Sequence, residues 1–165
     1  MRARRVLPLV GVYLAGWGCA GTSPTVDIGS DFGSFNGAKV EVSDVGGFAA
    51  LSIAQIVDHD TRGFSYSQRR ICGTTCQAPM DTASGALGPA TTDSIFNVVL
   101  EQARQLPKDD YGTTTNAADM MTHTIRLTAN GRVRTIRGDD GTFPAAARRI
   151  VSTVREAISA ARRKD

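Results

Sequence analysis

The sequence has little of what most catalytic and metal centres are made from. Of its 165 residues only two are histidine, at positions 59 and 123, and only three are cysteine. It has no zincin helix motif, no nucleophile elbow and no phosphate-binding loop, because its glycines occur singly or in turns. We therefore predict no catalytic residues, no metal and no cofactor.

Neither histidine lies in a pattern typical of a metal ligand. His59 sits between Asp58 and Asp60, whose carboxylates could hold a cation, but a turn is expected there and turns favour such residues for their own hydrogen bonds. His123 lies on the apolar side of a predicted strand, where a hydrogen-bonded core residue is the commoner case. A cleft joining either histidine to two carboxylates would instead indicate an enzyme or a metal-binding protein.

Long hydrophobic runs are also absent, since no stretch reaches the roughly 20 apolar residues that span a bilayer. The one apolar run follows MRARR and ends at Cys19, which is the layout of an export signal over residues 1–18. Cleavage could occur before Cys19, leaving a diacylated cysteine, or after Ala20. We favour lipidation of Cys19, because a tether-like segment follows it. The chain is then a periplasmic or outer-surface lipoprotein that touches the membrane only through its lipidated N-terminus, and otherwise it is secreted.

The chain has no excess of basic or acidic residues once the predicted signal is removed. Loss of Arg2, Arg4 and Arg5 changes the balance from 19 basic and 16 acidic residues to 16 of each. A nucleic-acid partner is therefore not expected.

Two cysteines remain after the signal, Cys72 and Cys76. In an oxidising compartment an even pair favours a disulfide, here predicted between Cys72 and Cys76. The closed ring is short, so the stabilisation is roughly 2 kcal/mol, enough to fix a loop. A free or redox-active pair and metal ligation are the alternatives, but the spacing of three intervening residues does not match a thioredoxin-like site.

The rest of the chain divides into a tether and one domain. Residues 19–37 are rich in Gly, Ser, Thr and Asp, which indicates a flexible tether. Residues 38–165 form a domain large enough to bury about two-thirds of its unfolded surface. Extended runs are predicted at 38–45, 51–57 and 64–71 from the alternation of apolar and polar side chains.

The second half of the domain predicts a helix, a hairpin and a helix. Thr92 or Asp93 could cap the first helix, and Pro107 ends it. Asn130-Gly131 supplies the positive φ angles of a tight hairpin turn. In its second strand Val133 and Ile136 fall on opposite faces, which predicts a bulge or cover on both sides. The last helix is expected to begin with Thr142 as cap and Pro144 in its first turn, and to bury Ala147, Ile150, Val151, Val154 and Ile158.

Strands, helix, hairpin and helix in this order predict an α+β fold, in which an antiparallel sheet carries two helices on one face. Between the first two predicted strands, Gly46, Gly47 and Phe48 stand together. One interpretation is a glycine bulge with Phe48 turned into the core. The other is a contact site, in which the glycines admit a partner's backbone and Phe48 is a rigid apolar anchor, with Asp44 and Val45 at its border.

The stretch KVEVSDVGGFAAL resembles the opening of the emfourin family, small protein inhibitors of thermolysin-like zinc metalloproteases. In that family the strand typically runs into Ser-Gly-Gly-Phe-Ala-Gly; here Val45 replaces the serine and Ala50 the glycine that follows Phe-Ala. The helix TDSIFNVVLEQARQLP, the hairpin and the final helix resemble the family's later elements in the same order.

The resemblance implies a domain that blocks a secreted or periplasmic metalloprotease by docking Gly46, Gly47 and Phe48 at the catalytic cleft. The alternative is a lipoprotein of structural or interaction type that keeps the fold without inhibition. Exposure of Phe48 distinguishes the two, since a buried ring would favour the structural role.

Overall fold

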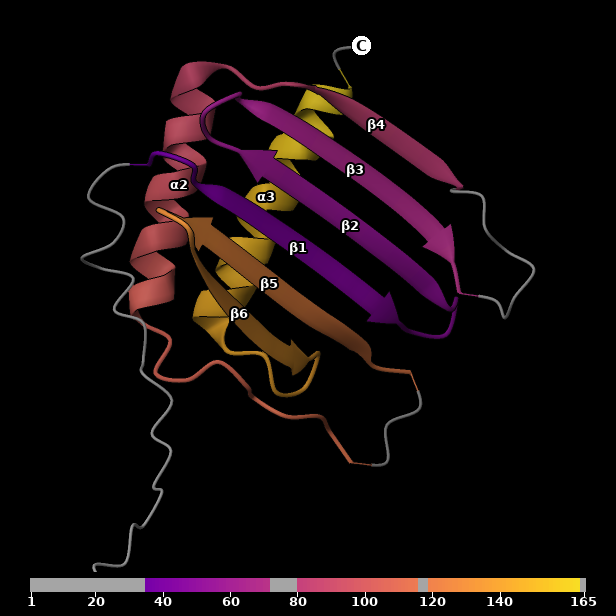
Figure 1. The fold of residues 1–165 in the computed structure, drawn as a ribbon. Coiled ribbons are helices and arrows are strands. Elements are labelled where there is room, and N and C mark those ends of the chain that lie inside the picture. Colours follow the sequence, from indigo (N-terminus) through magenta and orange to yellow (C-terminus); the bar gives the residue numbers. More distant parts are fainter. Residues whose placement is uncertain (1–34, 72–79, 116–118, 164–165) are drawn as a thin grey trace, which may run out of the picture.

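The computed structural model describes residues 35–71, 80–115 and 119–163, which form one sheet and two helices (Figure 1). The elements follow one another as β1 (Lys39–Gly46), β2 (Leu51–Asp58), β3 (Gly63–Arg70), β4 (Asp81–Ala86), α2 (Pro89–Arg104), β5 (Met121–Ala129), β6 (Arg132–Asp139) and α3 (Ala145–Arg162).

The sheet is antiparallel throughout and has the order β4-β3-β2-β1-β5-β6. β1 is therefore a central strand, paired with β2 on one side and β5 on the other. Both helices lie behind the same face of the sheet, and they pack against each other (Figure 1). The predicted α+β architecture is confirmed. Within the described ranges, neither helix has the length and apolar character to cross a bilayer.

Alternating side chains place the core between the sheet and the helices. Val40 and Val42 of β1 are fully buried, and so is Ile125 of β5 beside Val42. Phe96 of α2 is likewise wholly enclosed. The predicted apolar face of the last helix is confirmed in full, because the buried residues of α3 are Ala147, Ile150, Val151, Val154 and Ile158.

β4 is not among the extended runs predicted from the sequence. Its residues, Asp81–Ala86, are mostly small or polar, so they lack the alternation that indicates a strand. The strand forms at the edge of the sheet, where it pairs with β3 from Asp81 against Gln68 to Ala86 against Gly63.

The predicted helix caps are wrong at both helices. α2 begins at Pro89, and the hydroxyl of Thr92 donates back to the carbonyl of Gly88 at 3.2 Å. Pro144 directly precedes α3, while the Thr142 hydroxyl accepts the amide of Asp139 and donates to the carbonyl of Gly112, both at 2.9 Å. A proline suits a helix start because it has no N–H to satisfy and its φ is already near the helical value.

No bulge interrupts β6, contrary to the sequence-based expectation. Its register against β5 is regular from Thr122 opposite Asp139 to Ala129 opposite Arg132. Val133 is simply exposed on the outer face, because Arg134 takes the inward position beside it. The Arg134 guanidinium donates to the carbonyls of Ala103 and Leu106, at 3.0 and 2.7 Å.

Arg134 therefore closes the C-terminal end of α2, and it also pairs with Asp109 at 2.6 Å. We expect Arg134→Met to lower the free energy of unfolding by about 2–3 kcal/mol, because the helix carbonyls would stay buried without a donor. Urea unfolding checks this. Arg137→Met, three residues on and exposed, should change it by less than about 0.5 kcal/mol; equal costs would contradict the assigned role.

Candidate functional site

The turn between β1 and β2 carries the predicted contact residues. Its backbone has positive φ at Gly46 (115°), Gly47 (70°) and Ala50 (46°). The amide of Ala50 donates to the carbonyl of Gly47 at 3.0 Å, which closes the turn. Residues with a Cβ rarely adopt such angles, so the local geometry by itself favours glycine at the first two positions.

The chain that enters β5 lies close against both glycines. A Cβ on Gly46 would approach the carbonyl oxygen of Met120 to 3.0 Å, and one on Gly47 would lie 3.2 Å from Cγ of Met121. The amide of Gly47 also points to the Met120 carbonyl at 3.4 Å. The fold itself therefore accounts for the two glycines, and a partner is not needed to explain them.

Phe48 has no such explanation, since its side chain is 93% exposed at the apex of the turn. It contributes nothing to the core, and burial in the core was the feature that would have favoured a purely structural role. An aromatic ring held outside the fold by a closed turn is the kind of residue that anchors interfaces.

Phe48 is one of four exposed large hydrophobic residues that gather at one end of the sheet. Val45, Ile71 and Met80 are 45, 44 and 55% exposed. The amide of Ile71 donates to the carbonyl of Ala50 at 2.5 Å, which ties the end of β3 to the turn. We call Val45, Phe48, Ile71 and Met80 the apolar tip. Among the described residues the fifth exposed large hydrophobic, Val133, begins β6 at the opposite end.

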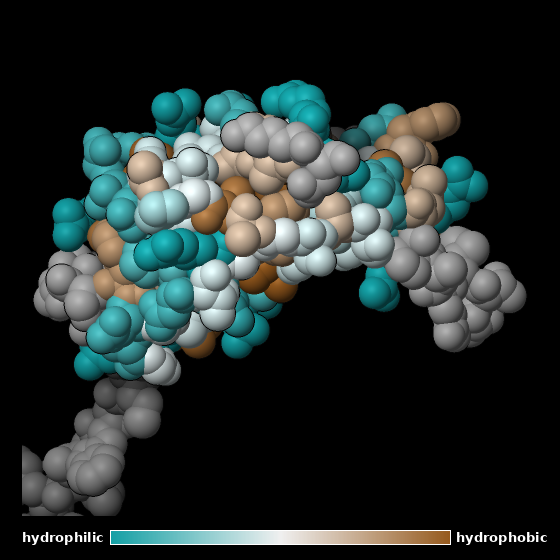
Figure 2. Space-filling model, turned by 90° about the horizontal axis from the view of Figure 1, so that it is seen from above, coloured by the Kyte–Doolittle hydropathy of each residue, from teal (hydrophilic) through white to brown (hydrophobic). Residues whose placement is uncertain are grey.

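The apolar tip lies where β1 and β3 end and β2 and β4 begin, on the right-hand side of Figure 1. Seen from above, hydrophobic surface projects at this end of the molecule (Figure 2). Cys72 and Cys76 belong to the connection between Ile71 and Met80 but lie outside the described residues, as do Cys19 and the predicted signal peptide. Their disulfide and lipidation stay predictions.

Packing of the domain reaches back to Phe35, within the segment that the sequence assigned to the tether. The Phe35 ring lies 4.8 Å from that of His59 and 5.8 Å from that of Phe96, measured between centroids. His59 also contacts Asp93 at 3.2 Å and Asp60 at 3.6 Å. It thus bridges the strand end to α2 as a partly buried ring.

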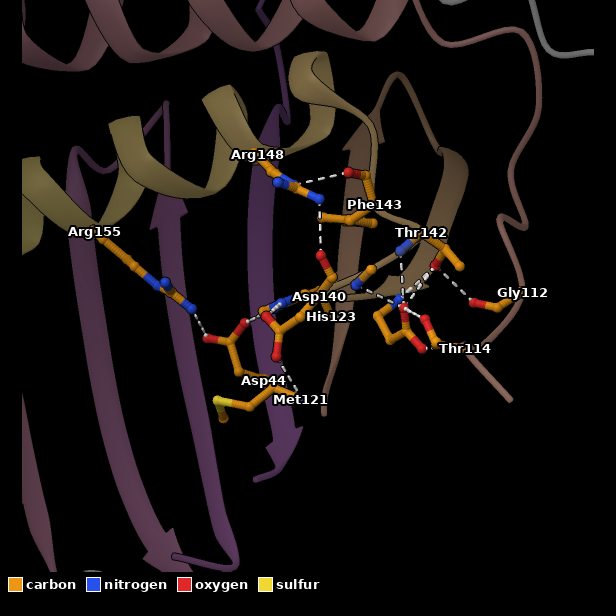
Figure 3. Close-up of polar contacts among 12 residues, drawn as sticks. Asp44, Gly112, Thr114, Met121, His123, Asp140, Thr142, Phe143, Arg148 and Arg155 are labelled. Carbon is orange, nitrogen blue, oxygen red and sulfur yellow. Dashed lines mark hydrogen bonds and ion pairs between the residues drawn. The ribbon is translucent and has the colours of Figure 1, made fainter. Parts of the chain in front are cut away.

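Asp44 does not border the apolar tip as expected, because its side chain is fully buried on the helix side of β1. One carboxylate oxygen lies 2.6 Å from Nδ1 of His123 and the other 2.5 Å from the Arg155 guanidinium of α3 (Figure 3). The second ring nitrogen of His123, Nε2, lies 2.7 Å from Asp140. We call Asp44, His123, Asp140 and Arg155 the His123 cluster.

Ion pairing sets the protonation of this cluster. The hydrogen bond to Asp44 raises the pKa of His123 against the opposing effect of burial, and the bond to Asp140 adds to it. Burial alone would raise the pKa of Asp44, but the bonds from His123 and Arg155 outweigh it and the pKa is lowered. The backbone amide of Met121, followed by His123, lowers the pKa of Asp140. The geometry is that of an imidazolium between two carboxylates.

A pocket of about 250 Å³ opens beside the cluster, lined by His123, Asp140, Arg148 and Ser152 among others. A histidine with two carboxylates at a cleft was the arrangement that would indicate a metal site or an enzyme. Here both ring nitrogens of the imidazolium are engaged by carboxylates, so neither offers a lone pair to a metal. Within the described part of the chain no group of three or more His, Cys, Asp or Glu side chains is placed to hold a metal.

Sequence reasoning missed half of the His123 cluster and half of the apolar tip, and it did not bring Asp44 and His123 together. Asp44 and Arg155 are 111 residues apart, and no periodicity connects them. The only local signal was the Asp139-Asp140-Gly141 turn before the last helix. Ile71 and Met80 were hidden because they flank a loop whose ends could not be placed without β4.

Comparison of the sequence with known protein families and with curated proteins found no match. The resemblance to emfourins therefore stays a hypothesis that depends on the quoted motifs.

The positive φ of Ala50 predicts strain in the turn. We expect Ala50→Gly to raise the free energy of unfolding by about 0.5–1 kcal/mol, because glycine adopts φ near 46° without a steric cost. Ala49→Gly, next to it and without a positive φ, should lower it by about 0.5–1 kcal/mol. Thermal or urea unfolding measures both, and effects of the same sign would contradict the argument.

The His123 cluster predicts that stability depends on pH. Because the folded-state pKa of His123 is raised above 6.5, its stabilisation is fully present below about pH 6.5 and is lost as the pH rises through the folded pKa. His123→Gln should therefore cost about 2–3 kcal/mol near pH 6 and less near pH 9. Urea unfolding at both pH values tests this, and a cost that grows with pH would refute it.

Proposed function

We propose that this chain is an exported, emfourin-like inhibitor of a thermolysin-like metalloprotease, and that Phe48 is the anchor that enters the target's cleft. The single observation that carries the proposal is the 93% exposure of Phe48 at the apex of the β1–β2 turn, with three further exposed apolar side chains at the same end of the sheet. Such an inhibitor carries no catalytic residues of its own.

Burial of the Phe48 ring in an apolar subsite would contribute roughly 1.5–3 kcal/mol, which the chain does not gain in its own core. Val45, Ile71 and Met80 could exclude water around it, as the surroundings of an interface anchor do. A target with an apolar subsite beside its reactive centre fits this surface.

The turn is also held rigidly before any partner binds. The amide of Ala50 donates to the carbonyl of Gly47 across the turn. Outside the turn, the amide of Gly47 donates to the carbonyl of Met120, and the carbonyl of Ala50 accepts from the amide of Ile71. A preformed loop loses little conformational entropy on docking, which favours tight binding. The chain reverses direction at this turn, so the turn cannot bind as an extended peptide that adds a strand to the edge of a sheet.

The second candidate is an interaction lipoprotein that uses the same tip without inhibiting a protease. It is favoured by the finding that Met120 and Met121 already account for Gly46 and Gly47. In this case the glycines shape the turn, and only the apolar side chains meet a partner.

An inhibition assay with thermolysin and related enzymes tests the proposal. We expect the purified protein to slow such an enzyme, and Phe48→Ala to weaken inhibition by about 2–4 kcal/mol, roughly 30- to 800-fold. Val133→Ala is the matched control, because it removes an exposed hydrophobic side chain at the other end of the sheet. It should change the inhibition constant less than about twofold.

Two results would count against the proposal in different ways. No inhibition of any thermolysin-like enzyme would contradict the protease as target. Inhibition with equal potency in Phe48→Ala would contradict the site. Thermal unfolding of each variant shows whether a loss of potency comes from a loss of fold.

A further inference from the structure

We infer that the His123 cluster is a positioning device for the turn that bears Phe48, and that partner binding through this turn depends on the proton held by His123. The partner in this inference rests on the proposed function, but the coupling between His123 and the turn does not. Asp44, His123 and Asp140 do not reach the apolar tip and act on it through the backbone.

The first link runs through Asp140. One of its carboxylate oxygens contacts Nε2 of His123 at 2.7 Å, and the other accepts the backbone amide of Met121 at 2.8 Å (Figure 3). Asp140 thus joins the ring to the first residue of β5. Its own amide donates to the Met121 carbonyl at 3.2 Å, so the two residues hold each other from both sides.

The second link runs from the start of β5 to the turn. The Met120 carbonyl faces the amide of Gly47 at 3.4 Å, and the Met121 side chain packs where a Gly47 Cβ would lie. Any shift of Met120 and Met121 therefore changes the support beneath Gly47, directly before Phe48.

A third contact fixes the same turn from the β1 side. Asp44 is two residues before Gly46, and its buried carboxylate is held by His123 and by Arg155 of α3. His123 contacts both Asp44 and Asp140, through Nδ1 and Nε2. Its ring therefore controls both chain segments that lead into the turn.

When His123 loses its proton, the ring can no longer donate a hydrogen bond to both carboxylates. A neutral imidazole has one N–H, so it can donate to only one of the two carboxylates. Asp44 is fully buried and keeps the donor, whereas the Asp140 side chain is 48% exposed and can turn to water. Asp140 then faces a lone pair on Nε2 and moves away, and Met121 loses its acceptor.

The groups around the ring come from every neighbouring element. Asp44 of β1 and Asp140 of the turn before α3 carry negative charge, while Arg155 and Arg148 of α3 carry positive charge. Arg148 donates to the backbone carbonyl of Asp140 at 2.8 Å and does not replace the proton. On the β6 side His123 pairs with Gly138, and the Phe143 ring stacks on it with centroids 5.2 Å apart.

Nuclear magnetic resonance on the full chain between about pH 5.5 and 9 tests the coupling without any partner. The amide signals of Gly47 and Met121 should titrate with the same midpoint as the His123 ring. Hydrogen exchange at Gly47, corrected for its intrinsic pH dependence, should rise about fivefold or more above that midpoint. Gly131, in the turn at the opposite end, is the internal control and should not respond. The inference would be overturned if the amide signals of Gly47 and Met121 do not follow the His123 titration, or if the His123 ring does not titrate in this pH range.

Asp140→Asn separates positioning from a general loss of stability. It leaves the contact of His123 with Asp44 in place, so the ring should still titrate while Gly47 and Met121 no longer follow it. Asp93→Asn is the matched control, because Asp93 is an exposed carboxylate that contacts Nε2 of the other histidine, His59, at 3.2 Å. It should leave the response of Gly47 unchanged; an unchanged response in Asp140→Asn would refute the link.

Binding to thermolysin then tests the consequence. The dissociation constant of the unmodified chain should rise about five- to tenfold as the pH passes the His123 midpoint. The dissociation constant of Asp140→Asn should not show this rise. If the turn follows His123 but no protease binds, the proposed function fails and the coupling stands. If Phe48-dependent binding occurs with the same pH profile in both proteins, the coupling fails and the proposed function stands.

Discussion

The structure depends on one buried carboxylate. Asp44 lies in the central strand of the sheet without exposure to water, and an uncompensated charge there would cost several kcal/mol. It is compensated by His123 from β5 and by Arg155 from α3, so one side chain joins the middle of the sheet to the helix layer. His123 and Arg155 belong to different elements and approach the carboxylate from different sides. Together they hold α3 in place against the sheet and hold the end of β1 against β5. The exposed turn begins only two residues later, so this buried ion-paired strand leads directly to the exposed ring of Phe48.

This arrangement separates two roles that the sequence presented together. Gly46 and Gly47 are required by positive φ angles and by the nearness of Met120 and Met121, so they belong to the fold. Phe48 is exposed and adds nothing to the core, so the proposed contact depends on this residue and not on the glycines. The distinction matters for the family resemblance, because a glycine pair by itself could be shared by proteins that have only the architecture in common. Evidence for inhibition has to come from the ring and from the apolar residues around it.

Local patterns were sufficient for most elements and insufficient for the site. Alternation identified β1, and helical spacing identified the whole buried face of α3, because each pattern reflects a single interface with the core. The pattern failed for β4, whose small polar residues pack against little, and for β6, where Arg134 occupies an inward position that a hydrophobic residue normally fills. Phe48 was identified from its neighbours. The partners of Asp44 were not, because they are 79 and 111 residues away and ion pairs of that separation leave no trace in a linear sequence.

The central position of β1 has a consequence for the order in which the chain can fold. Its neighbour β2 follows at once, but its other neighbour, β5, and the histidine that neutralises Asp44 come 79 residues later. Contacts of such long sequence separation form late and slow the folding of small domains. Until β5 arrives, one edge of β1 and the Asp44 charge have no partner from that side, so the strands made first cannot reach their final state alone. The native state is therefore completed only when the residues from Met121 onward are present, so the sheet cannot close around β1 earlier.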